Sequence, residues 1–212
     1  MHKECTGYIE LCSGFQKDMK RYYLTNTMPT QTAQEQATIL QNIPKAIEKI
    51  CMQMNFDAIS LFENFMIVRK HSKLGIINDC GIIIVPVKMS VIIPPVKCQR
   101  KLFCIKDAHS KWGATDERGQ VVVPFGTYHN MWGFDTDYCL VDNGSDETHF
   151  TDRAIINSNA EIVIGYGKYT SIWDFYAKPY SSIVAERAEM KYYLSKTNPS
   201  IIIKEERNII ND

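Results

Sequence analysis

The chain has 212 residues, with 24 basic and 24 acidic side chains, so its formal net charge is zero. General binding of nucleic acid needs a basic face for phosphate contacts, and this balance argues against it. No segment approaches the length of apolar sequence that a membrane-spanning helix needs, and the first residues lack the apolar core of a signal peptide. We therefore expect a cytoplasmic protein with no membrane contact.

The first part of the chain, residues 1–54, has a helical pattern. Thr32 and Glu35 have the spacing of a capping box, which predicts a helix start, and Pro44 predicts a kink or a break into two short helices. The expected apolar face of a preceding helix is Ile9, Cys12, Phe15, Met19, Tyr22 and Tyr23. The expected buried stripe after Thr32 is Ala33, Ala37, Leu40, Ile47, Ile50, Cys51 and Met54.

Two roles fit this helical segment. It is either a cap that covers the end of the following domain, or a docking element that forms a homodimer or binds a partner.

From residue 55 onward, one phrase with the pattern of a β-hairpin returns about every 40 residues. Its second arm is rich in β-branched residues, and Asn, Asp or Gly stands between the arms, where a short turn needs them. Gly75, Gly113, Ala154 and Tyr193 are aligned as one column, and the turns are expected at 79–81, 117–119, 158–160 and 197–199. The four copies are Lys73–Pro86, Lys111–Pro124, Asp152–Gly165 and Lys191–Lys204.

A second phrase alternates with the hairpins and places aromatic and apolar residues three apart. It reads Tyr128-Met131-Phe134 and Tyr169-Ile172-Phe175, and Phe56-Ile59-Phe62 precedes the first hairpin. Residues that every unit keeps usually build a shared core. We therefore expect five aromatic side chains to be buried: Trp112, Trp132, Trp173, Phe134 and Phe175.

These columns resemble the WG-repeat family, bacterial tandem repeats of similar length. The resemblance covers roughly residues 55–204, although only Trp112-Gly113 spells the signature dipeptide. It implies a β-rich scaffold. It implies no catalytic residues, because the family has no general catalytic mechanism.

The expected fold is therefore mainly β, with a helical segment at 1–54 and a domain of four tandem hairpin or meander repeats at 55–212. The hairpin array lacks a final aromatic phrase, and an extra copy stands before its first hairpin. This favours closure into a ring, propeller-like or barrel-like, in which residues 56–70 pair with the hairpin 191–204. The alternative is an open array whose ends the helices cover.

Seven cysteines without a C-x-x-C pair or a zinc pattern indicate free thiols. Cys104 and Cys139 are expected to be buried in strands, and Cys80 to be exposed in a turn. We expect no cofactor and no metal site.

Segments that interrupt the repeat are the better candidates for binding, because loops on a rigid scaffold commonly hold specificity. The first is a basic segment around Pro94-Pro95, and the second is an acidic insertion. An ionic attraction between the two is the alternative explanation. The candidate residues are Lys88, Lys97, Arg100 and Lys101 in the first and Asp146, Glu147 and His149 in the second.

The function expected from these features is non-enzymatic binding of a protein or peptide partner on the repeat scaffold. One alternative is an enzyme, or a nucleotide- or metal-handling protein, that uses Asp146, Glu147 and His149. Another is a small inhibitor or immunity-type protein that blocks one partner.

Overall fold

The structure is a computed structural model, and it describes residues 24–25, 32–40, 45–144, 152–173 and 182–207. The fold is mainly β, as the sequence predicts, with two helices among the described residues. Neither of these helices has the length and apolar character needed to cross a bilayer.

The strands form four antiparallel sheets, and apart from β1, neighbouring strands in each sheet follow one another in the chain. The first sheet contains β2 (Ala58–Phe62), β3 (Phe65–Lys70), β4 (Lys73–Asn78) and β5 (Ile83–Met89). The second contains β6 (Val91–Ile93), β7 (Leu102–Lys106), β8 (Trp112–Asp116) and β9 (Val121–Val123), and β1 (Leu24–Thr25) adds to its β6 edge.

The third and fourth sheets repeat this order. The third contains β10 (Asn130–Asp135), β11 (Tyr138–Asp142), β12 (Arg153–Asn157) and β13 (Ile162–Ile164). The fourth contains β14 (Ser171–Trp173), β15 (Ser182–Arg187), β16 (Met190–Ser195) and β17 (Ile202–Arg207).

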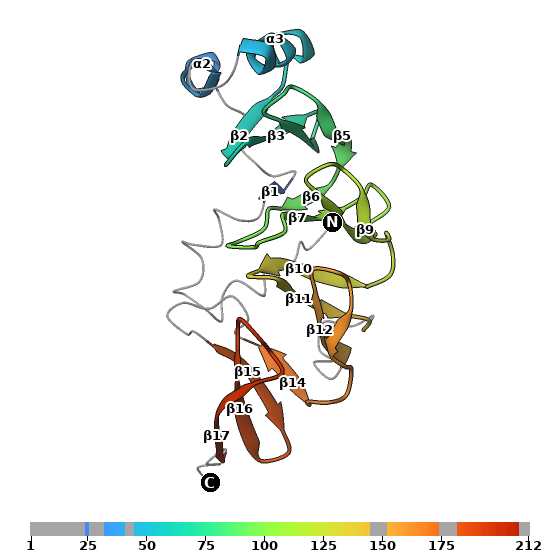
Figure 1. The fold of residues 1–212 in the computed structure, drawn as a ribbon. Helices are drawn as coiled ribbons and strands as arrows, with labels where there is room; N and C mark the ends of the chain where they lie inside the picture. The colour runs from blue at the N-terminus through green and yellow to red at the C-terminus, as the bar shows by residue number, and fades with distance from the viewer. Residues whose placement is uncertain (1–23, 26–31, 41–44, 145–151, 174–181, 208–212) are drawn as a thin grey trace.

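Each unit begins at the aromatic phrase and ends with the hairpin. The phrase from Phe56 to Phe62 therefore belongs to the first unit, because β2 pairs with β3 of that unit. Among the described strands no ladder joins the first sheet to the last, and the two sheets lie at opposite ends of an extended row (Figure 1). Among the described residues the structure forms an open row and not the ring predicted from the sequence, because its first and last sheets lie apart and share no ladder.

The hairpin turns lie where the sequence places them. In the first three units an Asn or Asp side chain accepts backbone N–H groups two and four residues ahead: Asn78 from Cys80 and Ile82, Asp116 from Arg118 and Gln120, and Asn157 from Asn159 and Glu161. Gly81, Gly119 and Ala160 take a positive φ in the third turn position. This combination matches a three-residue hairpin loop with a bulge, and the register shifts beside each turn.

The fourth hairpin turns within the expected residues but is paired in a different register. Its loop is longer, since Ser195 N–H donates to Ile201 O across five intervening residues. In the third unit the column residue Ala154 pairs with Val141 of β11. In the fourth unit Ala185 holds the position of Val141, and its partner is Tyr192. The column predicted to contain Tyr193 therefore contains Tyr192, and Tyr193 faces the opposite side of the sheet.

The sheets stack face to face along the row, and the core lies between them. One cluster joins the first and second sheets, another joins the second and third, and another joins the third and fourth. Three residues paired across neighbouring strands form the face that each sheet turns toward the next, and we call these three residues the forward triplet. The first three triplets, all buried, are Ile67-Ile76-Val85, Cys104-Ala114-Val123 and Leu140-Ile155-Ile164.

The helices flank the outer face of the first sheet. Thr32 and Glu35 form the predicted capping box, with Glu35 N–H donating to Thr32 Oγ1 over 3.2 Å, and α2 (Ala33–Leu40) and α3 (Lys45–Met54) lie on either side of Pro44. Cys51 of α3 is buried in the cluster on this face, with Ile50 and Met54 beside it. Ala33 and Ala37 are exposed, contrary to the predicted stripe, and residues 1–23 lie outside the described part of the chain.

The aromatic side chains are only partly in the core. Trp112 and Phe134 are buried as predicted, and Trp132 is half-buried beneath the guanidinium of Arg153. Trp173 is 38% exposed, so its predicted burial is wrong. It lies on the forward side of the last sheet, where no described sheet follows. Phe175 lies outside the described residues.

We predict that Gly119→Ala destabilises the protein more than Gly167→Ala. Both glycines have a left-handed φ, which costs an alanine about 1–2 kcal/mol. At Gly119 a Cβ would also lie 2.4 Å from Ile84 O of the preceding sheet, whereas at Gly167 it would meet nothing within 4 Å. Urea unfolding of the two variants measures the difference. Equal losses in the free energy of unfolding would show that the chain relieves the contact between the added Cβ and Ile84 O without cost.

Candidate functional site

The basic segment lies between the second and third sheets. Pro94 and Pro95 are buried, and Val96 forms a parallel bridge to Asp135 of β10. Val96 N–H donates to Phe134 O, and Val96 O accepts from Thr136 N–H, each over 2.8 Å. The segment is therefore part of the contact between two units.

Two cations of this segment bind within the molecule. Arg100 Nη1 donates to Ser158 O at 3.1 Å, and its Nη2 lies 3.8 Å from the Asp116 carboxylate, so Arg100 links the turns of the second and third hairpins. Lys101 forms an ion pair with Glu63 and lies over the ring of Phe65 in the first sheet. Among the described residues, ionic attraction between units thus accounts for Arg100 and Lys101, and the partners of Arg100 lie in the hairpin turns.

Lys88 and Lys97 have exposed side chains. They stay candidate binding residues, as the sequence predicts.

We predict that Arg100→Ala lowers the free energy of unfolding by about 1 kcal/mol, because it removes a hydrogen bond to a carbonyl and a half-exposed ion pair. Lys88→Ala, which removes an exposed lysine of β5, is the control and is expected to leave stability unchanged. Chemical denaturation of both variants tests this. An unchanged free energy of unfolding in the Arg100→Ala variant would mean that the contacts of Arg100 with Ser158 and Asp116 are not stabilising.

The acidic insertion is described only at its borders, because Asp146, Glu147 and His149 lie outside the described residues. Just before it, the carboxylate of Asp142 is buried. Asn130 Nδ2 donates to it at 3.3 Å, and His129 Nδ1 lies 4.0 Å away. Burial raises the pKa of Asp142, although the hydrogen bond from Asn130 and the charge of Arg153 act in the opposite direction. Within the described ranges, no three Cys, His, Asp or Glu side chains are placed to hold a metal ion.

We predict that Asp142→Asn becomes more stable relative to the native protein as pH rises. The folded-state pKa of Asp142 is raised, so its stability contribution is full below the ordinary value of 3.8 and is lost as pH rises through the folded value. An asparagine keeps an acceptor for Asn130 and does not ionise. Melting temperatures between pH 3 and pH 7 measure the difference, and a difference that does not vary with pH would contradict the burial effect.

Five cysteines lie within the described residues, and all are free thiols. Cys51, Cys98, Cys104 and Cys139 are free thiols that are buried or half-buried, and Cys80 is exposed, as the sequence predicts for Cys80, Cys104 and Cys139. Burial raises the pKa of Cys98 to about 12 and that of Cys51 to about 11. A thiol reacts as the thiolate, so these two are unreactive at neutral pH.

A feature that the sequence reasoning missed is a set of exposed β-branched residues on the last strand of every sheet. Each is the first residue after the hairpin turn that pairs with the preceding strand. We call this set the apolar column: Ile83 (43% exposed), Val121 (56%), Ile162 (53%) and Ile202 (47%). Its signal was present in the sequence. Successive residues of a strand face opposite sides and the last strand has a neighbour on only one side, so a run of three β-branched residues there can leave one at the surface.

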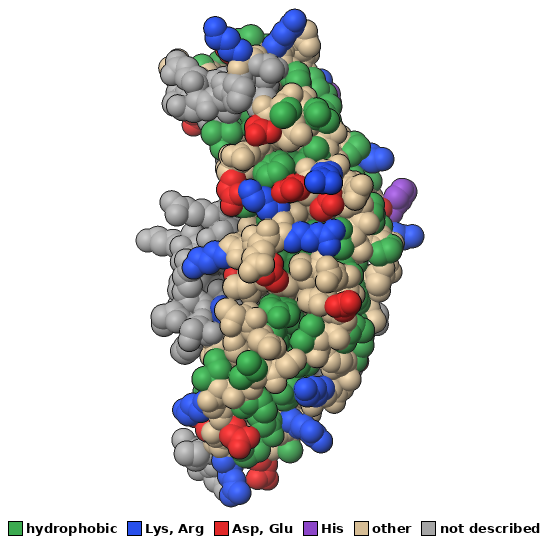
Figure 2. Space-filling view, viewed as in Figure 1, with side chains coloured by type: hydrophobic (Ala, Val, Ile, Leu, Met, Phe, Trp, Pro, Cys, Tyr) green, Lys and Arg blue, Asp and Glu red, His purple; other side chains and the backbone are tan. Residues whose placement is uncertain are grey.

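The apolar column lies among polar groups. In Figure 2, hydrophobic side chains reach the surface at several levels of the row, between charges of both signs. β5 and β9 lie along the same side of the row in Figure 1. A partner lying along this side would meet one apolar side chain from each of the first two sheets, Ile83 of β5 and Val121 of β9.

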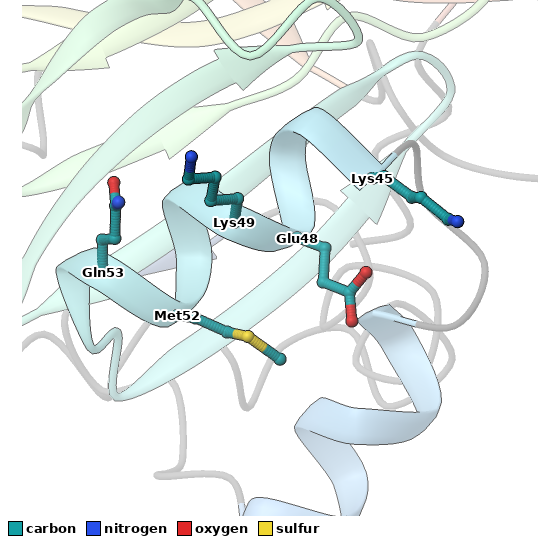
Figure 3. A pocket seen from close by; sticks show the side chains of 5 residues that line it. All are labelled: Lys45, Glu48, Lys49, Met52 and Gln53. Carbon is teal, nitrogen blue, oxygen red and sulfur yellow. The ribbon is translucent and has the colours of Figure 1, made fainter.

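A shallow hollow of about 440 Å³ lies on α3, lined by Lys45, Glu48, Lys49, Met52 and Gln53. These side chains point in different directions and do not converge (Figure 3). Small-molecule sites are concave and contain convergent polar groups, so this hollow does not have the features of one.

A scan of the sequence against protein-family models finds no match, and a search of curated proteins finds none.

Proposed function

We propose that the protein is a non-enzymatic binding scaffold of the WG-repeat type that engages a protein or peptide partner in the cytoplasm. The observation that carries this proposal is the apolar column, which places one half-exposed β-branched side chain at the equivalent position of each unit. Apolar groups that recur at the surface of a stacked array suit an extended partner. The free thiols agree with a reducing compartment.

The spacing of the units favours a particular form of partner. Stacked sheets lie about 10 Å apart, and two turns of an α-helix advance about 11 Å. An amphipathic helix lying along the row would thus bring an apolar residue near each unit at every seventh position. Three units would need about three heptads of such a helix. The last strand of each sheet also presents backbone groups beside the column, which can add polar contacts.

The test uses Val121→Asp with Gln120→Asp as a matched control. Both add the same carboxylate to adjacent exposed residues of the second hairpin, but only Val121 belongs to the apolar column. The full chain is used as bait in cells that express it, and affinities are then measured with the captured partner.

We expect Val121→Asp to weaken binding about tenfold or more, because burial of a valine side chain in an interface stabilises it by about 1.5 kcal/mol or more. Gln120→Asp is expected to bind as the native chain does. Equal binding by both variants, each with an unchanged melting temperature, would contradict the proposal.

A further inference from the structure

The last strand of the fourth sheet differs from the last strands of the other three. β5 contains Pro86, β9 is followed by Pro124, and β13 is followed by Gly165. Proline removes a backbone donor and glycine weakens a strand, so both limit pairing at an edge. β17 is six residues long and contains neither.

The outer edge of β17 is both apolar and unpaired in the described structure. β16 pairs with one side of β17, and no described strand pairs with the other. Ile201, which directly precedes the strand, Ile202 and Ile203 are each about half exposed. An exposed edge with adjacent isoleucines is a template for pairing with another strand, and here it begins at Ile202, before the register of the ladder with β16 shifts at Ile203.

The backbone of the hairpin shows which residue presents its hydrogen-bonding groups to this edge. Ile201 N–H donates to Asn198 O, and Ile201 O accepts from Ser195 N–H, so both groups point into the hairpin. Opposed residues of an antiparallel ladder alternate between bonded and non-bonded pairs. Ile202, the next residue, pairs with Leu194 and therefore directs its own N–H and C=O toward the open edge.

We propose that β17 pairs antiparallel with β17 of a second copy of this chain, about a two-fold axis at Ile202. A two-fold axis perpendicular to a sheet places one residue opposite its own copy. An axis at Ile202 sets Ile202 against Ile202, Ile201 against Ile203, and Lys204 against Ser200. β-branched residues then meet each other, and such cross-strand pairs are favourable.

The other axes along this strand are less favourable. An axis at Lys204, Glu205, Glu206 or Arg207 would place like charges opposite each other, which is destabilising. An axis at Ile203 would set Ile201 and Ile202 against Glu205 and Lys204. The charges of the strand thus select the isoleucine register, in which no like charges face each other.

Charge and symmetry favour a second copy over an unrelated strand. The edge is complementary to itself, and a two-fold interface uses the same patch on both chains, so it closes at two copies. β17 also lies at the end of the row opposite α3 (Figure 1), where only the fourth sheet borders it among the described residues. Ile202 also belongs to the apolar column, so the dimer would cover the column at the fourth unit and leave Ile83, Val121 and Ile162 for the proposed partner.

The experiment compares Ile202→Lys, Ile202→Glu and their equimolar mixture with the native chain by sedimentation equilibrium. The native chain is expected to be a dimer. Each single variant should dimerise at least tenfold more weakly, because the axis sets two like charges face to face. The mixture should recover the dimer, since lysine then faces glutamate. Ile162→Lys, at the equivalent position of β13, is the control and should dimerise as the native chain does.

Four outcomes would overturn the proposal: a native chain that is monomeric up to about 100 µM, a concentration at which even weak complexes form; a dimer unaffected by Ile202→Lys; a mixture that stays monomeric; or species larger than dimers. Recovery by the mixture also shows that each variant is folded, because an unfolded chain could not pair.

Discussion

The structure depends on the burial of both faces of the first three sheets. A soluble antiparallel sheet commonly covers one face and leaves the other to water. Here β3, in the middle of the first sheet, has Ile67 buried on one face and Val68 buried on the other. At roughly 25 cal/mol for each Å² of apolar surface, a sheet of this kind gains most of its stability from its two neighbours. Stacking in a row follows from this, and so does the need to cover the two ends.

The two ends of the row meet this need differently. At the first sheet α3 adds Cys51 to the outer cluster. At the last sheet the forward triplet is Val184-Tyr193-Lys204, so a lysine occupies the position of Val85, Val123 and Ile164. The ammonium of Lys204 lies 5.2 Å from the ring centre of Tyr193, and that of Lys191 lies 5.5 Å from that of Trp173. These aromatic faces are covered by cations, and a terminal repeat needs such a polar outer surface.

Polar contacts between units add to the stacking of apolar faces. Lys101 binds Glu63 of the preceding unit, and Arg100 binds Ser158 of the following one. Lys196 lies 3.7 Å from Asp135 of the third unit, and its backbone oxygen accepts from Thr136 Oγ1. Burial raises the pKa of Asp135 while Lys196 and Lys97 oppose that rise. Partly buried ion pairs of this kind fix the position of one sheet against the next more than they add stability.

The local features of this fold could be predicted from the sequence, and the non-local ones could not. The first three turns followed from Asn, Asp and Gly at fixed offsets, because such turns depend on a few adjacent residues. The fourth register was wrong because its longer loop between Ser195 and Ile201 shifts the pairing, and a shift of one residue exchanges the faces of the strand. The open row, the contacts of Arg100 and the exposure of Trp173 each depend on which unit lies beside which, and a repeat pattern does not contain that information.

The stacked faces and the strand edges therefore have separate roles. The first-strand edges are largely covered: β1 pairs with β6, Val96 bridges to β10, and α2 lies against β2. The last strands carry the apolar column, whose members are exposed while the first three forward triplets beside them are buried. A substitution in the column would leave the stacked core intact, and under the proposed function it would change what the surface binds. In that proposal one scaffold keeps its stability while the residues on one edge of each sheet determine its partner.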